Sequence, residues 1–430
     1  MTHFTEKLYD KSPYDFSFQA KVLDVVEDKD RTAVILDRTL FFPEGGGQVS
    51  DKGTLTIGDV TYNVVDVQNN EGIIYHYVDN SVHVDNSVHV DNSVPLKDSK
   101  AQGEIDFKYR FSNMQQHSGE HIFSGLARKY YDCTNVGFHL SDSEVTFDYD
   151  KPLSEEQIYD LETKTNEVIY QNRKITAFYP KEDELKNLDY RSKKEIEGDV
   201  RLVEIQGVDL CACCAPHVGY TGEIGICKVV DYINYKGGVR ISILCGERAL
   251  EYYRELDNIT RGISRSLSAA RLELINEVTR ISEALKEAEY KNVNTQKRYL
   301  DLIFELLPVV ESDSEVEKSV KEHGIVKNIT VNGNAVIISL AEADGKAVRN
   351  MVNKLKSKYP DKLTGVITDS SKGYAFIMGS ESYDCRRVAE ALRKQLGAKG
   401  GGSESMIQGN LDKELTKEDI DLLCTNAGEL

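Results

Sequence analysis

The stretch MQQHSGEHIF, residues 114–123, carries two histidines, His117 and His121, four residues apart. On a helix this interval puts both imidazoles on one face, one turn apart. The segment DLCACCAPHVGYTG, residues 209–222, repeats the interval with Cys213 and His217. Two imidazoles on one helix, with a thiolate and an imidazole from a second segment, form a ligand set that suits Zn2+. The sequence therefore predicts a metal site that joins these two segments and organises the fold around it.

Simpler interpretations compete with a metal site. A His pair at this spacing is common on helix surfaces, but three of the chain's nine histidines fall in these two segments. The order HSGEH differs from the HExxH of zinc proteases, in which a Glu follows the first His as general base. Glu120 precedes the second His instead, which argues against a protease. Cys211 and Cys214 are alternatives to Cys213 as the thiolate ligand, and the sequence leaves that choice open.

Composition bounds the class of protein. The chain has 430 residues, 40% of them hydrophobic and 29% charged, which is ordinary globular composition. Its length suggests about two to four domains. No run of apolar residues is long enough for a transmembrane span, and the N-terminus does not resemble a signal peptide. Because of this, no membrane partner is expected. Eight cysteines, three of them in CACC, indicate the reduced thiols of a cytoplasmic protein, some of them available for a metal.

Charge is unevenly distributed along the chain. The formal net charge of −18 argues against a nonspecific nucleic-acid binder. Between Lys346 and Lys399, however, twelve Lys or Arg stand against five Asp or Glu. A local basic face of this kind can bind nucleic acid specifically, since charges farther away than a Debye length are screened.

Short strands are predicted through residues 17–40 and again after residue 53, as in a small antiparallel barrel. Between them lies FFPEGGGQVSDKG, residues 41–53, whose Gly45, Gly46 and Gly47 permit a close backbone approach. A plain hairpin loop is the alternative. The run lacks the context of a dinucleotide site and the GKS/T of a P-loop, so nucleotide binding is rejected there.

A hexapeptide repeat, DNSVHVDNSVHVDNSV, occupies residues 79–94. It is interpreted as a duplication within a hairpin loop. His83 and His89 alternate with valines as in a strand, and no Cys or acidic partner has matching spacing, so a metal site is not predicted there.

The period becomes helical from Tyr109, with Ser112 or Asn113 as the expected N-cap. Strands are predicted around NVGFH and in the segment that leads into the Cys/His stretch, with a second helix at 153–172 between them. An α+β domain is therefore expected, with the metal held between a helix and a loop that follows a strand.

Residues 248–300 carry apolar side chains every three or four positions, from Leu256 to Ala288, and no proline interrupts them. A helical hairpin that links two domains and a coiled coil that dimerises explain this seam equally well. Gly262 is the expected weak point. After Gly324, alternating strands and helices indicate an α/β domain. It ends in AKGGGSESMIQGNL, where glycines after a basic helix either approach phosphate or form a C-cap loop.

Four motifs in this order give the chain a resemblance to a known family. FFPEGGGQVSDKG resembles an N-terminal glycine-rich motif, HSGEH an H-x3-H motif, and CCAPHVGYTGEIG a CGGTHV-x2-T-x-EIG motif. KGGGSESMIQG resembles the closing motif of a DHH-associated domain. The family is that of the alanyl-tRNA editing proteins of the AlaX type, in their long form, related to the editing and C-terminal domains of alanyl-tRNA synthetase.

The resemblance implies an α+β multidomain fold. Its expected parts are a β-barrel domain with the glycine-rich motif at 1–104, a zinc-bearing α+β editing domain at 105–247, a long helical, coiled-coil-like spacer at 248–311, and a DHH-associated tRNA-binding domain at 312–430.

The implied activity is hydrolysis, without ATP, of the ester that joins serine, and secondarily glycine, to alanine tRNA. One Zn2+ per chain is expected, and the implied partner is the mischarged tRNA, with a homodimer through the spacer or tail as a further expectation. The implied site residues are the metal ligands His117, His121, Cys213 and His217; the catalytic candidates Glu120, Gln116 and His139; the substrate contacts Gly45, Gly46, Gly47, Gly137 and Thr221; and the tRNA contacts Lys394, Lys399, Gly400, Gly401 and Gly402.

The chain also departs from the family pattern. Cys214 and Ala215 stand where Gly-Gly is usual, and Pro216 replaces a Thr, so fine specificity is open. Gly137 stands where related synthetase domains tend to carry a Gln, and Ile407 replaces the Ala of the closing motif. Three protein ligands leave a coordination position on zinc open for water or substrate. Four protein ligands fill the coordination shell, so that the ion only holds the surrounding residues in place.

Two other functions compete with the hydrolase. One is a zinc-structured RNA-binding module without catalysis. The other is a phosphoesterase, which the absence of a DHH triplet disfavours. Aminoacylation is not expected, because the chain shows no synthetase portion before the barrel.

Overall fold

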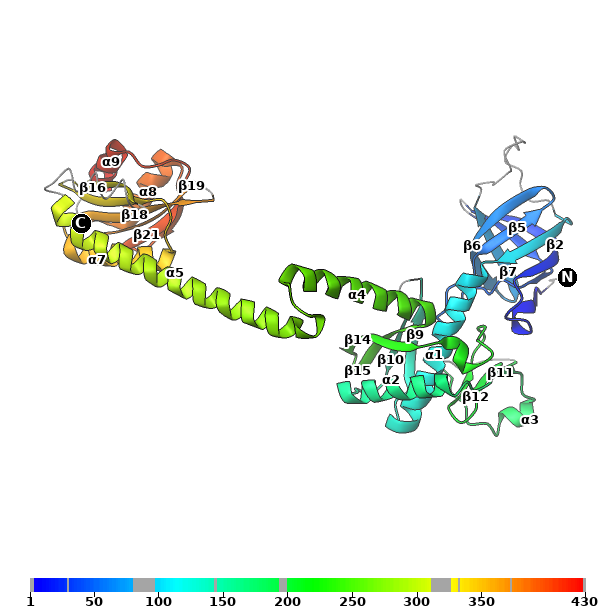
Figure 1. Cartoon of the computed structure of the whole chain (residues 1–430). Coiled ribbons are helices and arrows are strands. Elements are labelled where there is room, and N and C mark those ends of the chain that lie inside the picture. Colours follow the sequence, from blue (N-terminus) through cyan, green and yellow to red (C-terminus); the bar gives the residue numbers. More distant parts are fainter. Residues whose placement is uncertain are drawn as a thin grey trace. The chain divides into compact units, whose positions relative to one another are not determined.

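The computed structural model describes residues 4–28, 31–79, 97–142, 145–192, 199–310, 326–331, 333–371 and 373–427. The chain divides into two compact units, Met1–Gly262 and Ile263–Leu430, each of which is described by itself (Figure 1). Most of the predicted 79–94 repeat, with His83 and His89, lies outside the described residues.

A closed six-stranded barrel opens the first unit, as the alternating pattern predicts (Figure 1). Its interior is filled by apolar side chains such as Val34, Leu55 and Ile74. A short helical turn, η1 (Leu8–Asp10), and a parallel strand pair, β1 (Glu6–Lys7) with β4 (Arg38–Thr39), lie beside it. The barrel runs, in spatial order, through β2 (Ser17–Asp28), β3 (Arg31–Leu36), β7 (Ile73–Asp79), β6 (Val60–Asn70), β5 (Gly53–Ile57) and β8 (Lys100–Ile105).

Helix α1 (Phe107–Tyr131) is the centre of the α+β part, and almost every residue from Asn113 to Ala127 is buried. It begins earlier than predicted. Asp106 is the N-cap and accepts a hydrogen bond from the Tyr109 amide. Ser112 and Asn113, the predicted caps, lie inside the helix and accept hydrogen bonds from Arg248.

Two sheets and a second long helix surround α1. One sheet has the order β14-β15-β10-β9 and the other the order β11-β12-β13. Helix α2 begins with a capping box formed by Ser154 and Gln157. The bounds are β9 (Asn135–Leu140), β10 (Val145–Tyr149), α2 (Glu155–Tyr170), β11 (Ile175–Phe178), α3 (Glu182–Leu185), β12 (Leu202–Ile205), β13 (Asp209–Ala212), η2 (Thr221–Ile224), β14 (Cys227–Tyr235) and β15 (Gly238–Cys245).

The predicted helical region consists of α4 (Gly246–Leu267), η3 (Arg271–Glu273) and α5 (Leu274–Val310). The interruption lies at Ser268, which has a positive φ of 51°, and not at Gly262. Apolar side chains along the predicted seam, such as Ile259 and Leu285, are exposed. No helix among the described residues is long and apolar enough to cross a membrane.

The second unit holds a mixed six-stranded sheet of order β16-β17-β18-β19-β21-β20. Helix α7 packs on one face, while α8 and α9 pack on the other (Figure 1). The glycines 400–402, for which the sequence predicts either a phosphate contact or a C-cap loop, form edge strand β20. The bounds are β16 (Val326–Val331), β17 (Ala335–Leu340), α7 (Gly345–Lys358), β18 (Leu363–Ser370), β19 (Gly373–Gly379), α8 (Cys385–Leu396), β20 (Lys399–Gly402), β21 (Met406–Leu411) and α9 (Lys417–Ala427).

Candidate metal centre

The four predicted metal ligands meet in the first unit. Ligand atoms of His117 and His121 on α1, and of Cys213 and His217 after β13, all lie within 4.8 Å of one another. Cys213 Sγ is 3.6 Å from Nε2 of His117 and 3.3 Å from Nε2 of His217. The imidazole centroids are 4.6 to 5.2 Å apart. Segments ninety residues apart in sequence thus converge as the spacing predicts.

Each imidazole in this cluster is held through its Nδ1 atom. Nδ1 of His117 lies 2.7 Å from Gln48 Oε1, and Nδ1 of His121 lies 3.0 Å from Asp209 Oδ2. Nδ1 of His217 lies 3.0 Å from Ser118 Oγ. An Nδ1–H donated to an oxygen acceptor leaves Nε2 with a lone pair, which is the tautomer that a metal-binding histidine needs.

The distances suit a tetrahedral ion. Bonds of about 2.0–2.3 Å from one zinc ion to nitrogen and sulfur put the donors about 3.3–3.8 Å apart. The two Cys213 separations are close to this range. A set of three nitrogens and one sulfur is also the donor chemistry that Zn2+ favours. The residues present therefore fit the ion that the sequence predicts.

Burial favours the neutral forms of two of these groups, His217 and Cys213. It lowers the pKa of His217 well below its usual value, and the neighbouring His121 and His117 lower it further. Burial also raises the pKa of the Cys213 thiol. A metal ion must therefore displace the thiol proton when it binds, so its binding releases a proton.

Asp209 belongs to a second group of possible ligands, His121, Asp209 and Cys211. Burial tends to raise the pKa of Asp209, but the charge and hydrogen bonds of Arg191 outweigh it and leave the pKa below its usual value. Arg191 Nε and Nη2 donate to Oδ1 and Oδ2 at 2.6 and 2.8 Å. Because Arg191 holds both carboxylate oxygens, this second group fits a metal ion less well than the first.

The glycine-rich loop packs directly against this centre. A Cβ at Gly47 would overlap the carbonyl oxygen of Phe138 on β9, so only glycine allows this approach. The Phe138 ring centroid lies 4.6 Å from that of His117. A Cβ at Gly45 or Gly46 would lie 3.8 or 3.6 Å from Cys214 Sγ. The loop, Phe138 and the exposed Cys214 thus surround one side of the ligand cluster.

The three catalytic candidates lie in different environments. Glu120 is buried, and its Oε1 accepts hydrogen bonds from Ser124 of the same helix and from Asn135, the second of which ties α1 to β9. Gln116 bonds both backbone groups of Cys245, so its amide links α1 to the end of β15. His139 is exposed and points to the opposite face of β9 from Phe138, since strand side chains alternate. Phe138, and not His139, contacts the cluster.

Two of the expected substrate contacts, Gly137 and Thr221, make contacts within the folded chain. Gly137 also lies on the far face of β9, where a Cβ would be 3.1 Å from the Asp148 carboxylate. The Thr221 hydroxyl donates to Val168 O at 2.9 Å and accepts from the Arg173 amide at 2.8 Å. Both residues therefore have structural roles, and their contact with substrate stays a prediction.

The tRNA candidates lie in the second unit. Lys394 is exposed and paired with Glu390 at 2.7 Å. Lys399 begins β20 beside the three glycines. Gly400 and Gly402 are required for packing, because a Cβ at either would overlap the backbone of β21.

Sequence reasoning missed the residues that orient the imidazoles: Gln48, Ser118, Arg191 and Asp209. Three of them lie within motifs quoted above, and Ser118 is part of HSGEH. Gln48 directly follows the glycine run, and Asp209 begins the Cys/His stretch. A search for one oxygen acceptor per ligand histidine could have found them.

Comparisons with known proteins relate the chain to alanyl-tRNA synthetases and to an alanyl-tRNA editing protein. Family profiles match at residues 7–96 (tRNA synthetases class II (A)), 200–242 (threonyl and alanyl tRNA synthetase second additional domain) and 332–427 (DHHA1 domain). The alanyl-tRNA editing protein AlaX-L of Pyrococcus horikoshii is 27% identical over 412 residues, which cover 95% of each chain.

Alanine–tRNA ligases are also similar. That of Ignicoccus hospitalis is 28% identical over 93% of this chain and 40% of its own length, and that of Aeropyrum pernix is 25% identical over 99% and 45%. The chain thus spans less than half of these ligases. The C-Ala domain of Aquifex aeolicus alanyl-tRNA synthetase covers 24% of this chain and 96% of its own at 17% identity, with a TM-score of 0.20 that supports no conclusion.

Proposed function

The chain belongs to the alanyl-tRNA editing proteins of the AlaX type, and we propose from this that it deacylates mischarged alanine tRNA in trans. The proposed substrate is Ser-tRNA(Ala), with Gly-tRNA(Ala) second. The reaction is hydrolysis of the ester between the amino acid and the 3′ end of the tRNA, so it requires no ATP. We place this activity in the cytoplasm, where charged tRNA is used.

The observation that carries the proposal is the convergence of three imidazoles and one thiol, each imidazole oriented through its Nδ1 atom. We propose that His117, His121, Cys213 and His217 hold one Zn2+. When bound, the ion can polarise a carbonyl, lower the pKa of a bound water or orient the aminoacyl group. Four protein ligands favour the orienting role.

The residues around the cluster supply selectivity in this proposal. The loop Gly45–Gly47, Phe138 and Cys214 lie together on one side of the ligands. We propose that this side faces the aminoacyl group and that backbone atoms of the loop approach it. A site with a hydrogen-bonding partner for the serine hydroxyl can strongly reject alanine, which lacks the hydroxyl.

The second unit is proposed to bind the tRNA. The excess of Lys and Arg between 346 and 399 is the electrostatic basis. Some of these cations are already engaged: Lys354 pairs with Asp301, and Arg386 pairs with Asp384. Lys399, at the start of β20, is the cation that we place against the RNA.

Deacylation assays test this proposal. The full chain is incubated with Ser-, Gly- and Ala-tRNA(Ala), with and without a metal chelator, and beside a His121→Ala variant. Rapid loss of the serine ester, slow loss of the alanine ester, and slower reaction after chelation or substitution are expected. A non-catalytic RNA-binding module would protect the ester instead, and that result would refute the hydrolase.

A further inference from the structure

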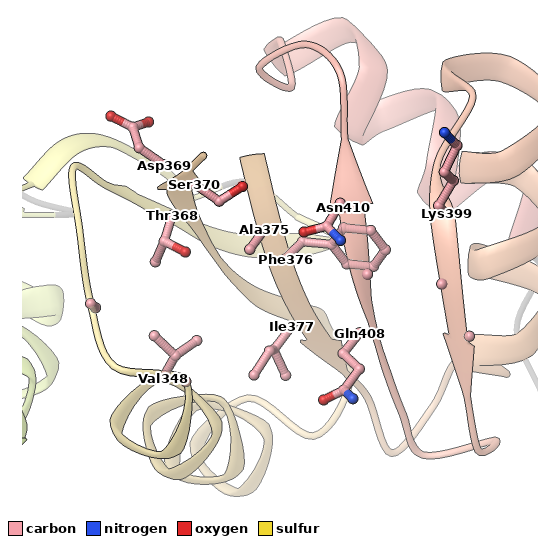
Figure 2. Close-up of a pocket in the computed structure, with 15 residues that line it drawn as sticks. Val348, Thr368, Asp369, Ser370, Ala375, Phe376, Ile377, Lys399, Gln408 and Asn410 are labelled. Carbon is pink, nitrogen blue, oxygen red and sulfur yellow. The ribbon is translucent and has the colours of Figure 1, made fainter. Parts of the chain in front are cut away.

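The second unit contains a cavity of about 610 Å3 on the face of the sheet that carries α7 (Figure 2). Helix α7 packs against β18 and β19. The outer strands β21 and β20 are covered by α8 on the opposite face. The cavity lies where α7 begins, and its lining comes from β18, β19, β21, β20 and the first turns of that helix. Its volume is typical of small-molecule sites, which span about 300–1,000 Å3.

Strand register places two rows of side chains across this face. The cross-strand pairs are Thr368 with Ala375, Ala375 with Asn410, and Asn410 with Lys399. The next row runs through Val366, Ile377, Gln408 and Gly401. The first row thus offers a hydroxyl, a carboxamide and an ammonium. The second row offers apolar surface, the carboxamide of Gln408 and an open position at its end.

The lining combines an apolar base with polar groups at one side. Val348 of α7 and Ile377 of β19 form the apolar part, and Asn410 and Lys399 the polar part (Figure 2). Arg349 donates a hydrogen bond to Gln408, which brings a second cation to the edge of the cavity. Asp369 is paired with Lys327, so its negative charge is compensated.

These groups fit a nucleotide. Its flat base would contact the apolar part of the cavity, and its phosphate and the hydrogen-bonding atoms on the base edge would face the polar part. Unpaired bases in RNA are bound in this way, by packing of the ring and hydrogen bonds to its edge. A duplex, by contrast, presents its phosphates and grooves to a surface and does not fill a cavity. We propose that this cavity receives one unstacked nucleotide of the RNA strand, with the base against Val348 and Ile377 and its edge at Asn410. The inference rests on the proposed binding of tRNA by this unit.

Gly401 gives this inference a sharp test. A Cβ at Gly400 or Gly402 would overlap the backbone of β21, whereas a Cβ at Gly401 meets nothing within 4 Å. Gly401 also lines the cavity. A Gly401→Val substitution therefore fills the cavity without disturbing the strand pairing. Gly333 has the same open surroundings and does not line the cavity, so Gly333→Val is the matched control.

The experiment compares the full-length wild type, Gly401→Val and Gly333→Val. The affinity for uncharged tRNA(Ala) is measured by filter binding at fixed salt, and thermal unfolding checks that the variants fold. Saturation-transfer NMR with the four nucleoside monophosphates tests the cavity without tRNA. We expect Gly401→Val to weaken tRNA binding roughly tenfold and to abolish the monophosphate signal, with Gly333→Val unchanged. Asn410→Ala should weaken tRNA binding in the same direction.

Other results would overturn the inference. If Gly401→Val binds tRNA as tightly as the wild type, the cavity takes no nucleotide of the tRNA. If it loses only the monophosphate signal, the cavity binds free nucleotides and not RNA. If Lys399→Ala weakens tRNA binding while Gly401→Val does not, the RNA lies across the surface as a duplex. Deacylation is measured separately, so its absence would refute the proposed hydrolase and leave these binding results to decide the cavity.

Discussion

Oδ2 of Asp209 lies 3.0 Å from Nδ1 of His121, while Arg191 holds both oxygens of the same carboxylate. Both side chains of the Asp209–Arg191 pair are almost fully buried. The pair therefore fixes the ring orientation and tautomer of His121, a proposed metal ligand, through the Nδ1 atom.

Replacing Asp209 tests this arrangement. Asp209→Asn keeps the shape of the side chain but removes its charge and leaves Arg191 buried without its carboxylate. Loss of such a supporting group typically costs about 10- to 100-fold in metal affinity. We expect a loss of this size in zinc affinity, measured by competition with a chromophoric chelator. Asp148→Asn is the control, because Asp148 also pairs with an arginine, Arg240, but away from the cluster. Equal zinc affinity in the two variants would contradict the assigned role.

The contact between Gly47 and Phe138 makes a second prediction. Gly47→Ala and Gly237→Ala both place a side chain at a positive φ, 87° and 84°. This conformation alone costs about 1–2 kcal/mol. Gly47→Ala also forces its Cβ into the Phe138 carbonyl, whereas Gly237 has open space around it. We therefore expect a larger loss of unfolding free energy for Gly47→Ala, measured by urea denaturation. Equal losses would show that the loop can move away from β9 at no cost.

His76 predicts how the stability of the barrel depends on pH. Burial lowers its pKa from 6.5 to about 4, despite the hydrogen bond with Val34 O. The unfolded chain therefore binds the proton more readily. The contribution of neutral His76 to the free energy of unfolding is therefore complete above about pH 6.5 and is lost as the pH falls towards about 4. A shift of this size corresponds to roughly 3 kcal/mol.

Chemical denaturation at several pH values across this range measures the effect. His76→Gln should flatten the pH dependence relative to the wild type, since glutamine does not titrate. His139→Gln is the control, because His139 is exposed. A slope that is unchanged in His76→Gln would place the titrating group elsewhere.

The sequence predicts those parts of the site that depend on residues close together in the chain. The intervals of His117 with His121 and of Cys213 with His217 are local, so helix geometry and donor chemistry suffice to predict a joint ligand set. The partners Gln48 and Asp209 become neighbours only through folding, and nothing in their spacing marks them. His139 shows the same limit of sequence reasoning. Its imidazole has suitable chemistry, but strand β9 directs it to the opposite face from Phe138, which contacts His117.

The fold, too, has parts that the sequence pattern predicts and parts that depend on contacts formed on folding. Alternation of apolar residues predicts the barrel, and the three-to-four-residue period predicts the long helices. Glycine composition at 400–402 suggests either a phosphate contact or a C-cap loop and does not reveal the strand that forms there through pairing with β21. The interruption of the helices depends on the positive φ of Ser268. Serine has no marked preference for that conformation, so the sequence points to Gly262 instead.

The choice among the three cysteines gives the last prediction. Cys213 Sγ lies among the imidazoles, whereas Cys214 is exposed and faces the glycine loop. In cobalt-substituted protein, Cys213→Ser should lose the thiolate-to-cobalt charge-transfer band and bind metal more weakly. Cys214→Ser should keep both the band and the affinity, because its sulfur is not a ligand in this arrangement. If the band survives in Cys213→Ser and disappears in Cys211→Ser, the ion instead lies in the group formed by His121, Asp209 and Cys211.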